Sequence, residues 1–418
     1  MPSFTDEQVL LTLAGLAYRG SADAPLIAGH AGRVHALVEA GLTDLVPVRG
    51  EWDLAWGPAT SRERDEPFDS NMMYVVRQRH APERLVIAIR GTSPVLLSDW
   101  SFGDFWVTTT VPWPYAPLDG AVVSTSTAFG LVALQGMQAR ARSEQGIDRL
   151  VAAAADALGT VARAGAPSAA ALGGPTGRLH AVLGPPVLAA IAEWRSRLVR
   201  PDGTEAVRRA LANMPRPLPV ILRPRPDPAP GPGAPTDLVT WLAAEAASLG
   251  TPLDVTVTGH SKGAALAQAV ALWLHDTRAS EPWDAGHGAR LRCHAFAGPT
   301  PGNAAFARRF DAALGGSFQH MRNTNDIVTH AWQRDELQQI PALYGAETAL
   351  FADLVATLVT VTGSLDYGQP TPNRPTFAGP VAASRKFLEE FIHQHLDAYL
   401  HELGLDAHGI DALKLHIG

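Results

Sequence analysis

A strand followed within five residues by a helix of small side chains is the feature that most constrains the fold. Residues 253–258 read Leu-Asp-Val-Thr-Val-Thr, and residues 261–275 are rich in alanine and leucine. β-Branched residues favour strands, whereas alanine and leucine favour helices. The turn between the two elements is Gly259-His-Ser-Lys-Gly263. A helix that begins so soon after a strand must fold back onto the sheet, which is typical of an α/β protein.

The same alternation of helix and strand continues on both sides of this turn. The segment 84–90 is almost wholly apolar, as expected of a buried central strand. The pattern therefore predicts an α/β fold with a mostly parallel central sheet and helices on both faces. The expected strands are 72–79, 84–90, 253–258, 290–296 and 318–322, and the expected helical segments are 5–40, 236–247, 261–275 and 304–314.

The region between the first strands and the central turn has a different composition. Residues 128–215 are alanine-rich with a helical pattern, and residues 215–235 are crowded with proline and glycine. Such a proline-rich stretch forms a loop or a semi-rigid linker. We interpret residues 1–418 as a single domain in which 135–235 is a helical and proline-rich insertion, with a cap over the functional site as one role for it.

Ser261 is a candidate nucleophile because it stands at the centre of the motif G-x-S-x-G. A serine in a tight turn between a strand and a helix exposes its hydroxyl above the sheet, next to the N–H groups of the helix N-terminus. With 38 glycines in 418 residues, about 0.2 matches arise by chance, so the flanking strand and helix carry the prediction. The alternative is a turn of small residues in which Ser261 only caps the helix.

Composition excludes several other classes of protein. The net charge is −7 without a basic cluster, which argues against nucleic-acid binding. The single cysteine, Cys293, cannot form an intrachain disulfide, and a small buried apolar residue is its ordinary role, against the alternative of a nucleophile. The N-terminal residues lack the pattern of a signal peptide, and no apolar run is long enough for a transmembrane helix. A cytoplasmic location and leader-less secretion both stay open.

A second motif follows the strand 84–90. Arg90-Gly91-Thr92-Ser93 comes directly after it, with Asp99-Trp100 and Asp104 beyond. Together with the turn around Ser261, this resembles the class 3 lipases, the fungal-type triacylglycerol lipases of the α/β-hydrolase superfamily, although Ile89 stands where that family has phenylalanine. The resemblance implies an oxyanion hole formed by Thr92 and by the backbone N–H of Lys262. Taken alone, Arg90-Gly91-Thr92 would be an ordinary turn after a strand.

The resemblance also implies a lid at about 94–106. This segment contains several aromatic and aliphatic side chains, among them Trp100, Phe102, Phe105 and Trp106. An apolar surface helix suits contact with a lipid interface. Packing of the same side chains onto the core is the alternative, and the sequence does not decide between the two.

The acid that a serine–histidine pair requires is expected after a later strand. The stretches Phe296 to Phe306 and Met321 to Val328 resemble the corresponding family segments. The resemblance maps the acid to Asp326. An Asx turn is the alternative role for this residue. Thr329 and His330 replace the proline usual in the family, so the rim of the substrate site is expected to differ.

The histidine is expected near the C-terminus, where His393, His395 and His401 precede or follow Tyr399. The resemblance favours His395, four residues before Tyr399, with His393 as the main alternative and His401 and His330 after it. Metal binding by the three neighbouring histidines is disfavoured because their spacing is poor for one helical site. No metal or organic cofactor is expected.

The resemblance implies a serine ester hydrolase that cleaves carboxylic esters of lipids, as an acylglycerol lipase does, through a Ser261-Asp326-His395 triad, an acyl-enzyme and transient contact with a lipid interface. A short-chain esterase, a phospholipase or a polyester depolymerase would use the same residues, as would acyl transfer to an alcohol. A non-catalytic hydrolase-like binding module is the alternative from another class. Lys262 stands where many family members have an apolar residue; its ammonium group points either to solvent or towards an anionic head group. The oligomeric state stays open.

Overall fold

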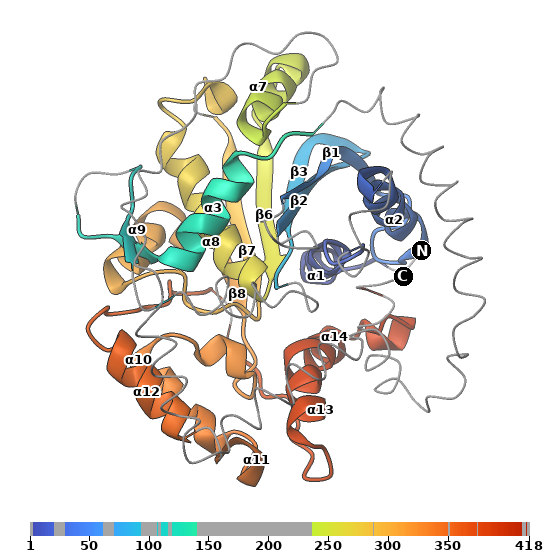
Figure 1. Cartoon of the computed structure of the whole chain (residues 1–418). Helices are drawn as coiled ribbons and strands as arrows, with labels where there is room; N and C mark the ends of the chain where they lie inside the picture. The colour runs from blue at the N-terminus through green and yellow to red at the C-terminus, as the bar shows by residue number, and fades with distance from the viewer. Residues whose placement is uncertain are drawn as a thin grey trace.

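A six-stranded sheet forms the centre of the computed structural model (Figure 1). Its order is β1-β2-β3-β6-β7-β8; β1, β2 and β3 pair antiparallel, and β3, β6, β7 and β8 pair parallel. The strand bounds are β1 Trp52–Ser61, β2 Asn71–Gln78, β3 Ala81–Ile89, β6 Asp254–His260, β7 Arg290–Phe296 and β8 Phe318–Met321. A short hairpin of β4 (Thr110–Pro112) and β5 (Val122–Ser124) stands apart from it.

The structure describes residues 3–20, 30–61, 71–92, 107, 110–115, 119–139, 236–286, 288–349, 352–373, 375–411 and 415. The predicted lid at 94–106 lies outside these residues, as does most of the predicted insertion, 140–235. Within the described ranges, no helix is both long enough and apolar enough to cross a membrane.

Helices cover both faces of the sheet, because successive side chains of each strand point to opposite sides. In β3, Ile87 and Ile89 belong to one buried cluster, whereas Val86 and Ala88 belong to another. The first cluster includes side chains of α3 (Thr125–Gln135), α7 (Leu238–Leu249), α8 (Lys262–Thr277) and α9 (Ala304–Leu314), and the second those of α1 (Asp6–Leu16), α2 (His30–Asp44) and α14 (Ala398–Glu402). The predicted fold class is confirmed.

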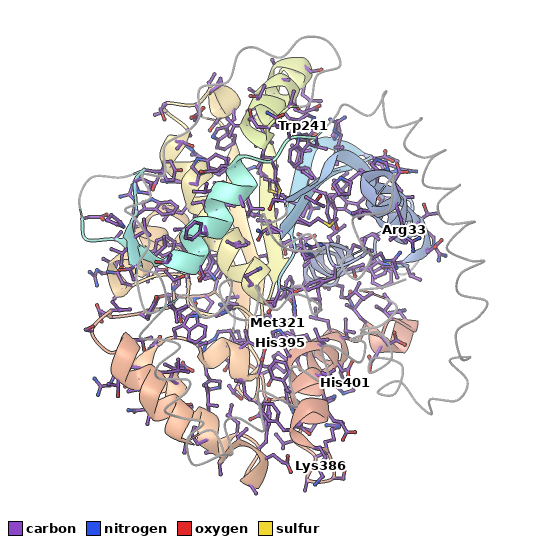
Figure 2. All side chains as sticks on the ribbon, in the orientation of Figure 1. Arg33, Trp241, Met321, Lys386, His395 and His401 are labelled. Atoms are coloured by element: carbon purple, nitrogen blue, oxygen red, sulfur yellow. The ribbon has the colours of Figure 1, made fainter. Side chains whose placement is uncertain are left out.

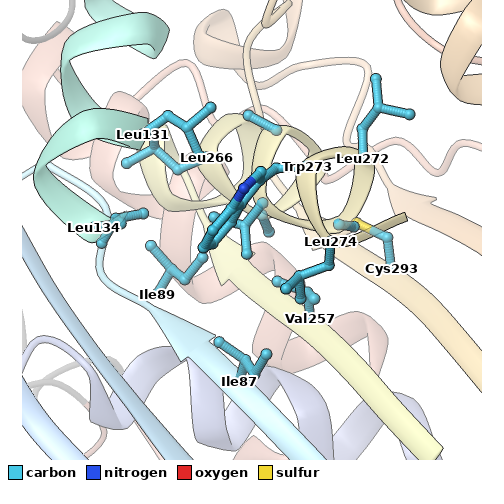
Figure 3. Close-up of a cluster of buried hydrophobic side chains, with 14 of the residues drawn as sticks. Ile87, Ile89, Leu131, Leu134, Val257, Leu266, Leu272, Trp273, Leu274 and Cys293 are labelled. Carbon is cyan, nitrogen blue, oxygen red and sulfur yellow. The ribbon is translucent and has the colours of Figure 1, made fainter. Parts of the chain in front are cut away.

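Helix α8, which follows the turn of Ser261, packs its apolar side chains onto the sheet. Trp273, Leu266 and Leu274 of α8 lie over Ile89 and Val257 of the strands (Figure 3). Each fully buried side chain of this size stabilises the fold by about 1.5–3 kcal/mol. Cys293 lies in the same cluster; its burial raises the pKa of the thiol, so the predicted role of a buried apolar residue is met.

The predicted insertion leaves and rejoins the described chain at one place. Ala139 and Thr236 form an isolated antiparallel bridge, with N–H to O distances of 3.0 and 2.9 Å in the two directions. The two residues that flank 140–235 therefore lie side by side. Adjacent ends are what an insertion into a continuous domain requires.

The C-terminal part adds a group of short helices below the sheet in Figure 1. They are α10 Arg334–Leu337, α11 Ala346–Ala349, α12 Ala352–Thr362, α13 Phe387–Ile392 and a π-helical turn, His393–Asp397, which leads into α14. A separate buried cluster that includes Trp332, Leu337 and Leu358 joins this region. Figure 2 shows His395 where α13 and α14 meet below the sheet, while His401 and Lys386 lie farther out on these helices.

Candidate active site

Three of the four parallel strands end in segments that carry predicted site residues. β3 ends at Ile89, just before Thr92; β6 ends at His260, just before Ser261; and β8 ends at Met321, five residues before Asp326. These strands run parallel within one sheet, so their carboxyl ends share an edge. Ligand sites of open α/β sheets lie at this edge. The predicted residues thus converge although the sequence separates them widely.

Ser261 occupies a strained turn of a single residue between β6 and α8. Its backbone has φ 61° and ψ −132°, in the positive-φ region that residues other than glycine rarely adopt. The Ser261 N–H donates to Phe296 O at 3.0 Å, and Ser261 O accepts from Ala264 N at 2.9 Å. Such a conformation costs about 1–3 kcal/mol and persists only where the surroundings impose it. The Ser261 side chain does not cap the helix, so the capping alternative is wrong.

Close packing of backbone around the turn explains its glycines. A Cβ on Gly259 would lie 2.2 Å from Gly263 O, and a Cβ on Gly263 would lie 2.4 Å from Ile89 O. A Cβ on Gly91 would lie 2.4 Å from His260 O and 3.0 Å from the Ser261 Cβ. The end of β3 therefore presses against the turn, which only glycine permits.

This approach brings Gly91, the residue before the predicted oxyanion donor Thr92, against the turn of Ser261. Thr92 directly follows Gly91, and its side chain is half-buried. Lys262 is the first residue of α8, where backbone N–H groups point out of the helix end. The residue is only 9% exposed, so most of its side chain is covered by neighbouring residues.

Asp326 is fully buried and accepts hydrogen bonds from a backbone N–H and from a histidine ring. Its Oδ1 accepts from Val328 N at 3.0 Å, which caps the short 3-10 helix Ile327–His330. The same carboxylate accepts from the His395 Nδ1 at 3.0 Å (Oδ1) and 2.9 Å (Oδ2). The Asx-type turn that the sequence offered as an alternative is present, and the turn aims the carboxylate at the histidine.

His395 is nearly buried, with its ring held between two others. The ring centroid lies 5.6 Å from that of Phe391, nearly parallel, and 4.6 Å from that of His260. Donation from Nδ1 to Asp326 leaves Nε2 of the neutral imidazole as a proton acceptor. π-Helical turns such as His393–Asp397 are frequent at functional sites, where they re-aim side chains.

The other candidate histidines pair elsewhere in the described part of the chain. His393 Nδ1 lies 3.9 Å from Asp397, one turn away, and His401 is an exposed partner of Asp406. His330 donates from Nε2 to Thr324 O at 2.9 Å, and its Nδ1 lies 3.0 Å from Glu336. Burial lowers the pKa of His330, but its bonds to Glu336 and Thr324 outweigh this and raise it. The geometry thus favours His395 over His393.

The sequence did not indicate the side chains that hold the Asp326–His395 pair. Tyr399 donates its hydroxyl to Asp326 Oδ2 at 3.0 Å and accepts from Asn323 N at 3.0 Å. Burial and the nearby Asp326 carboxylate raise the pKa of Tyr399 well above its ordinary value, so the hydroxyl remains a donor. Tyr399 had entered the prediction only as a spacing marker.

Asn323 is the second such residue. Its Nδ2 donates to the backbone O and the Oε1 of Gln394 at 2.9 and 2.7 Å, and its Oδ1 accepts from Gly379 N at 2.9 Å. Asn323 therefore ties the loop of Asp326 to the residue just before His395. Its signal in the sequence, an asparagine between a strand and an aspartate, is too common to single it out.

Ser261 and His395 are neighbours through His260. The His260 ring contacts the His395 ring, and its Nε2 lies 2.9 Å from His395 O. Among the described residues, no hydrogen bond joins the Ser261 hydroxyl to His395. Catalytic hydrogen bonds of this kind are often long without substrate and shorten when it binds.

Comparison with known proteins finds a family of lipases and solved lipase structures. Residues 238–336 match the family model described as "Lipase (class 3)"; this segment contains Ser261 and Asp326 but not Thr92 or His395. No curated protein matches the chain. The crystal structure of M37 lipase is 24% identical, with a TM-score of 0.68 over 99% of this chain and 97% of that one. The likeness to lipase II from Rhizopus niveus is weaker: 14% identity and a TM-score of 0.37 over 79% and 75% of the two chains. The family match confirms the predicted resemblance to class 3 lipases, and the likeness to M37 lipase confirms the predicted fold.

Proposed function

We propose that this chain, a carboxylic ester hydrolase of the lipase type, cleaves lipid esters with Ser261 as nucleophile, His395 as base and Asp326 as the acid that orients the base. One observation carries the assignment: the buried hydrogen-bonded pair of Asp326 and His395 lies at the same edge of the sheet as the strained turn of Ser261. A serine hydroxyl needs such a base, and the base needs a carboxylate that fixes its tautomer.

The reaction begins when His395 Nε2 takes the proton of Ser261. The alkoxide attacks the ester carbonyl carbon, and the negative charge that develops on the carbonyl oxygen is met by donors from Thr92 and the Lys262 backbone. The intermediate collapses as His395 returns the proton to the leaving alcohol. Water, activated by the same base, then releases the fatty acid from Ser261.

Asp326 stabilises the charged form of His395 during both steps. The carboxylate is fully buried, where an ionic hydrogen bond is stronger than in water. Val328 N and the Tyr399 hydroxyl also donate hydrogen bonds to the oxygens of this carboxylate. A buried carboxylate with these fixed donors orients the imidazole without moving during the reaction.

The lipid character of the substrate rests on the class 3 match, and within it we propose acylglycerols as the substrate class. We further propose one hydrolase domain with 135–235 as an insertion, which the adjacent positions of Ala139 and Thr236 support. The proposed reaction requires no metal or organic cofactor.

The test is turnover of p-nitrophenyl esters and emulsified triacylglycerol by the wild type, Ser261→Ala and His395→Ala. Both variants are expected to lose about 10⁴-fold or more of kcat. His393→Ala is the matched control, since His393 pairs with the more exposed Asp397, and it is expected to keep wild-type activity. A folded Ser261→Ala protein that hydrolyses esters as fast as the wild type would contradict the proposal. Labelling by a fluorophosphonate, mapped to Ser261, gives the same test without a chosen ester.

A further inference from the structure

The N-terminal part of the chain reaches the proposed active site through Tyr18. This residue follows α1, and its hydroxyl lies 3.1 Å from His260 Nδ1 and 3.2 Å from His260 O. The Tyr18 hydroxyl also packs against Gly91, because a Cβ added to Gly91 would lie only 2.0 Å from it. The Tyr18 hydroxyl therefore touches both the residue before the nucleophile and the residue before Thr92.

The hydrogen bonds of His260 define its tautomer. Its Nε2 lies 2.9 Å from His395 O, and a carbonyl oxygen can only accept, so Nε2 carries the proton. The Nδ1 atom of the neutral ring is then an acceptor, and the Tyr18 hydroxyl shares its one proton between this atom at 3.1 Å and His260 O at 3.2 Å. Tyr18 thus stabilises the one tautomer of His260 that can bind the backbone of His395.

The contact between His260 and His395 is both polar and apolar. Besides the bond to His395 O, the two rings lie 4.6 Å apart at an interplanar angle of 49°. Asp326 holds the other side of the base through Nδ1. His260 therefore holds the backbone carbonyl of His395 and packs against its ring, while Asp326 holds the Nδ1 edge of the same ring.

We propose that Tyr18 and His260 are positioning residues that act in series on His395: Tyr18 sets the tautomer of His260, and His260 holds the base at the distance from Ser261 that proton transfer needs. This inference rests on the proposed function of Ser261 and His395. A misplacement of reacting groups by a fraction of an ångström lowers the rate of the chemical step more than it weakens substrate binding. The expected signature is therefore a change in kcat with little change in KM.

The experiment measures kcat and KM for a soluble ester with Tyr18→Phe, His260→Gln and the double variant. Tyr18→Phe removes only the hydroxyl. In His260→Gln, the amide nitrogen can still donate to His395 O, but the ring that packs against the His395 ring is lost, and no acceptor remains at the place of Nδ1. Each single variant is expected to lower kcat by about tenfold with KM within about twofold, and the double variant is expected to be no slower than the slower single variant, since groups in series are not additive.

Tyr74→Phe is the matched control. The Tyr74 hydroxyl is also buried and donates to Leu13 O of α1 at 2.5 Å, but its ring belongs to strand β2 and, among the described residues, it makes no hydrogen bond to His260 or His395. Loss of this bond is expected to lower the melting temperature as Tyr18→Phe does, while kcat stays at the wild-type value. An equal fall of kcat in Tyr74→Phe would show a general loss of structure and overturn the inference.

The outcomes separate this inference from the function on which it rests. Wild-type kcat in Tyr18→Phe, or multiplied effects in the double variant, overturns the positioning role while Ser261→Ala still abolishes turnover. Equal, low turnover by the wild type and Ser261→Ala overturns the proposed function itself. If Tyr18→Phe does not fold, His260→Gln decides alone: a tenfold loss of kcat supports the role, and unchanged kcat overturns it.

Discussion

The two halves of the proposed site are held by different forces. On the nucleophile side, backbone packing imposes the geometry: Gly259 and Gly263 allow chain segments to approach so closely that Ser261 must adopt a strained conformation. On the acid–base side, side-chain hydrogen bonds impose it: Asp326 accepts from His395, Tyr399 and a backbone N–H. The nucleophile side makes no side-chain hydrogen bond of its own at Ser261 within the described ranges.

This difference implies that substitutions on the two sides fail in different ways. A side chain added to the turn of Ser261 collides with backbone that cannot move without disturbing β3, β6 and α8, so the fold should suffer first. A hydrogen bond removed from Asp326 or His395 leaves the backbone in place, so the chemistry should suffer first. The predictions below test this division.

Asp326→Asn is expected to have the largest effect. An amide accepts and donates, so it can hold His395 in the wrong tautomer and cannot stabilise the imidazolium; kcat should fall by about 10⁴-fold, as for the corresponding change in a serine protease triad. Ester turnover and thermal unfolding are measured together, and the melting temperature should change little. Asp397→Asn, which removes the partner of His393, is the control and should keep full activity. Equal losses of kcat in the two variants would contradict the assignment of His395 as the base.

Gly263→Ala is expected to come next, and to act on stability. Its Cβ would lie 2.4 Å from Ile89 O and 2.8 Å from the carbonyl carbon of Arg90. Overpacking against rigid backbone should cost about 3 kcal/mol or prevent folding. Gly316→Ala, where a Cβ meets nothing within 4 Å, should change the free energy of unfolding by less than about 0.5 kcal/mol. Urea unfolding measures both, and a stable, active Gly263→Ala would refute the steric account of the turn.

Tyr399→Phe is expected to have an intermediate effect on chemistry. The variant removes one donor to the Asp326 carboxylate and leaves the ring, and a hydrogen bond to a charged group contributes about 1.5–3 kcal/mol. We expect kcat/KM to fall by about ten- to a hundredfold. Tyr367→Phe removes another buried hydroxyl, which donates to Val107 O, and should leave kcat/KM unchanged. Wild-type kcat/KM in Tyr399→Phe would mean that the carboxylate is oriented without this bond.

The same division explains how far the sequence predicted the site. The turn of Ser261 is encoded locally, in residues 253–275, so its strand, its glycines and its helix could be predicted from pattern alone. Asp326 and His395 lie 69 residues apart, and their partnership became visible only through the resemblance to a family. Tyr18 lies 242 residues from His260 and has no motif, so no local signal could have found it.

Strand β1 is absent from the strands that the sequence predicted, and the reason again lies in contacts that a local pattern does not show. β1 was not predicted because its alternation of buried and half-exposed residues is broken where its register shifts between Trp56 and Ala59. Gly57 and Pro58 lie at this point, and both are ordinarily signals against a strand interior. Pairing with β2 along the rest of its length outweighs that local preference.

His320 links the two halves and gives the smallest expected effect. From β8, on the acid–base side, its Nε2 accepts from Gly298 N at 3.1 Å, and Gly298 packs against Ala264 of α8 behind the nucleophile. Complete burial, followed by the nearby Arg322 cation and His294, lowers the pKa of His320 well below its ordinary 6.5.

The fold therefore holds His320 neutral while the unfolded chain takes up a proton below about pH 6.5. Where the unfolded state binds more protons, stability falls as the pH falls, by at most about 1.4 kcal/mol per pH unit for one group. His320→Gln can still accept from Gly298 through its amide oxygen but cannot be protonated, so its free energy of unfolding should fall less steeply between pH 6.5 and 5. Urea unfolding at several pH values measures this slope. Equal slopes in the two proteins would place the acid sensitivity of the fold in other groups, and would leave the contact between the two halves dependent on packing alone.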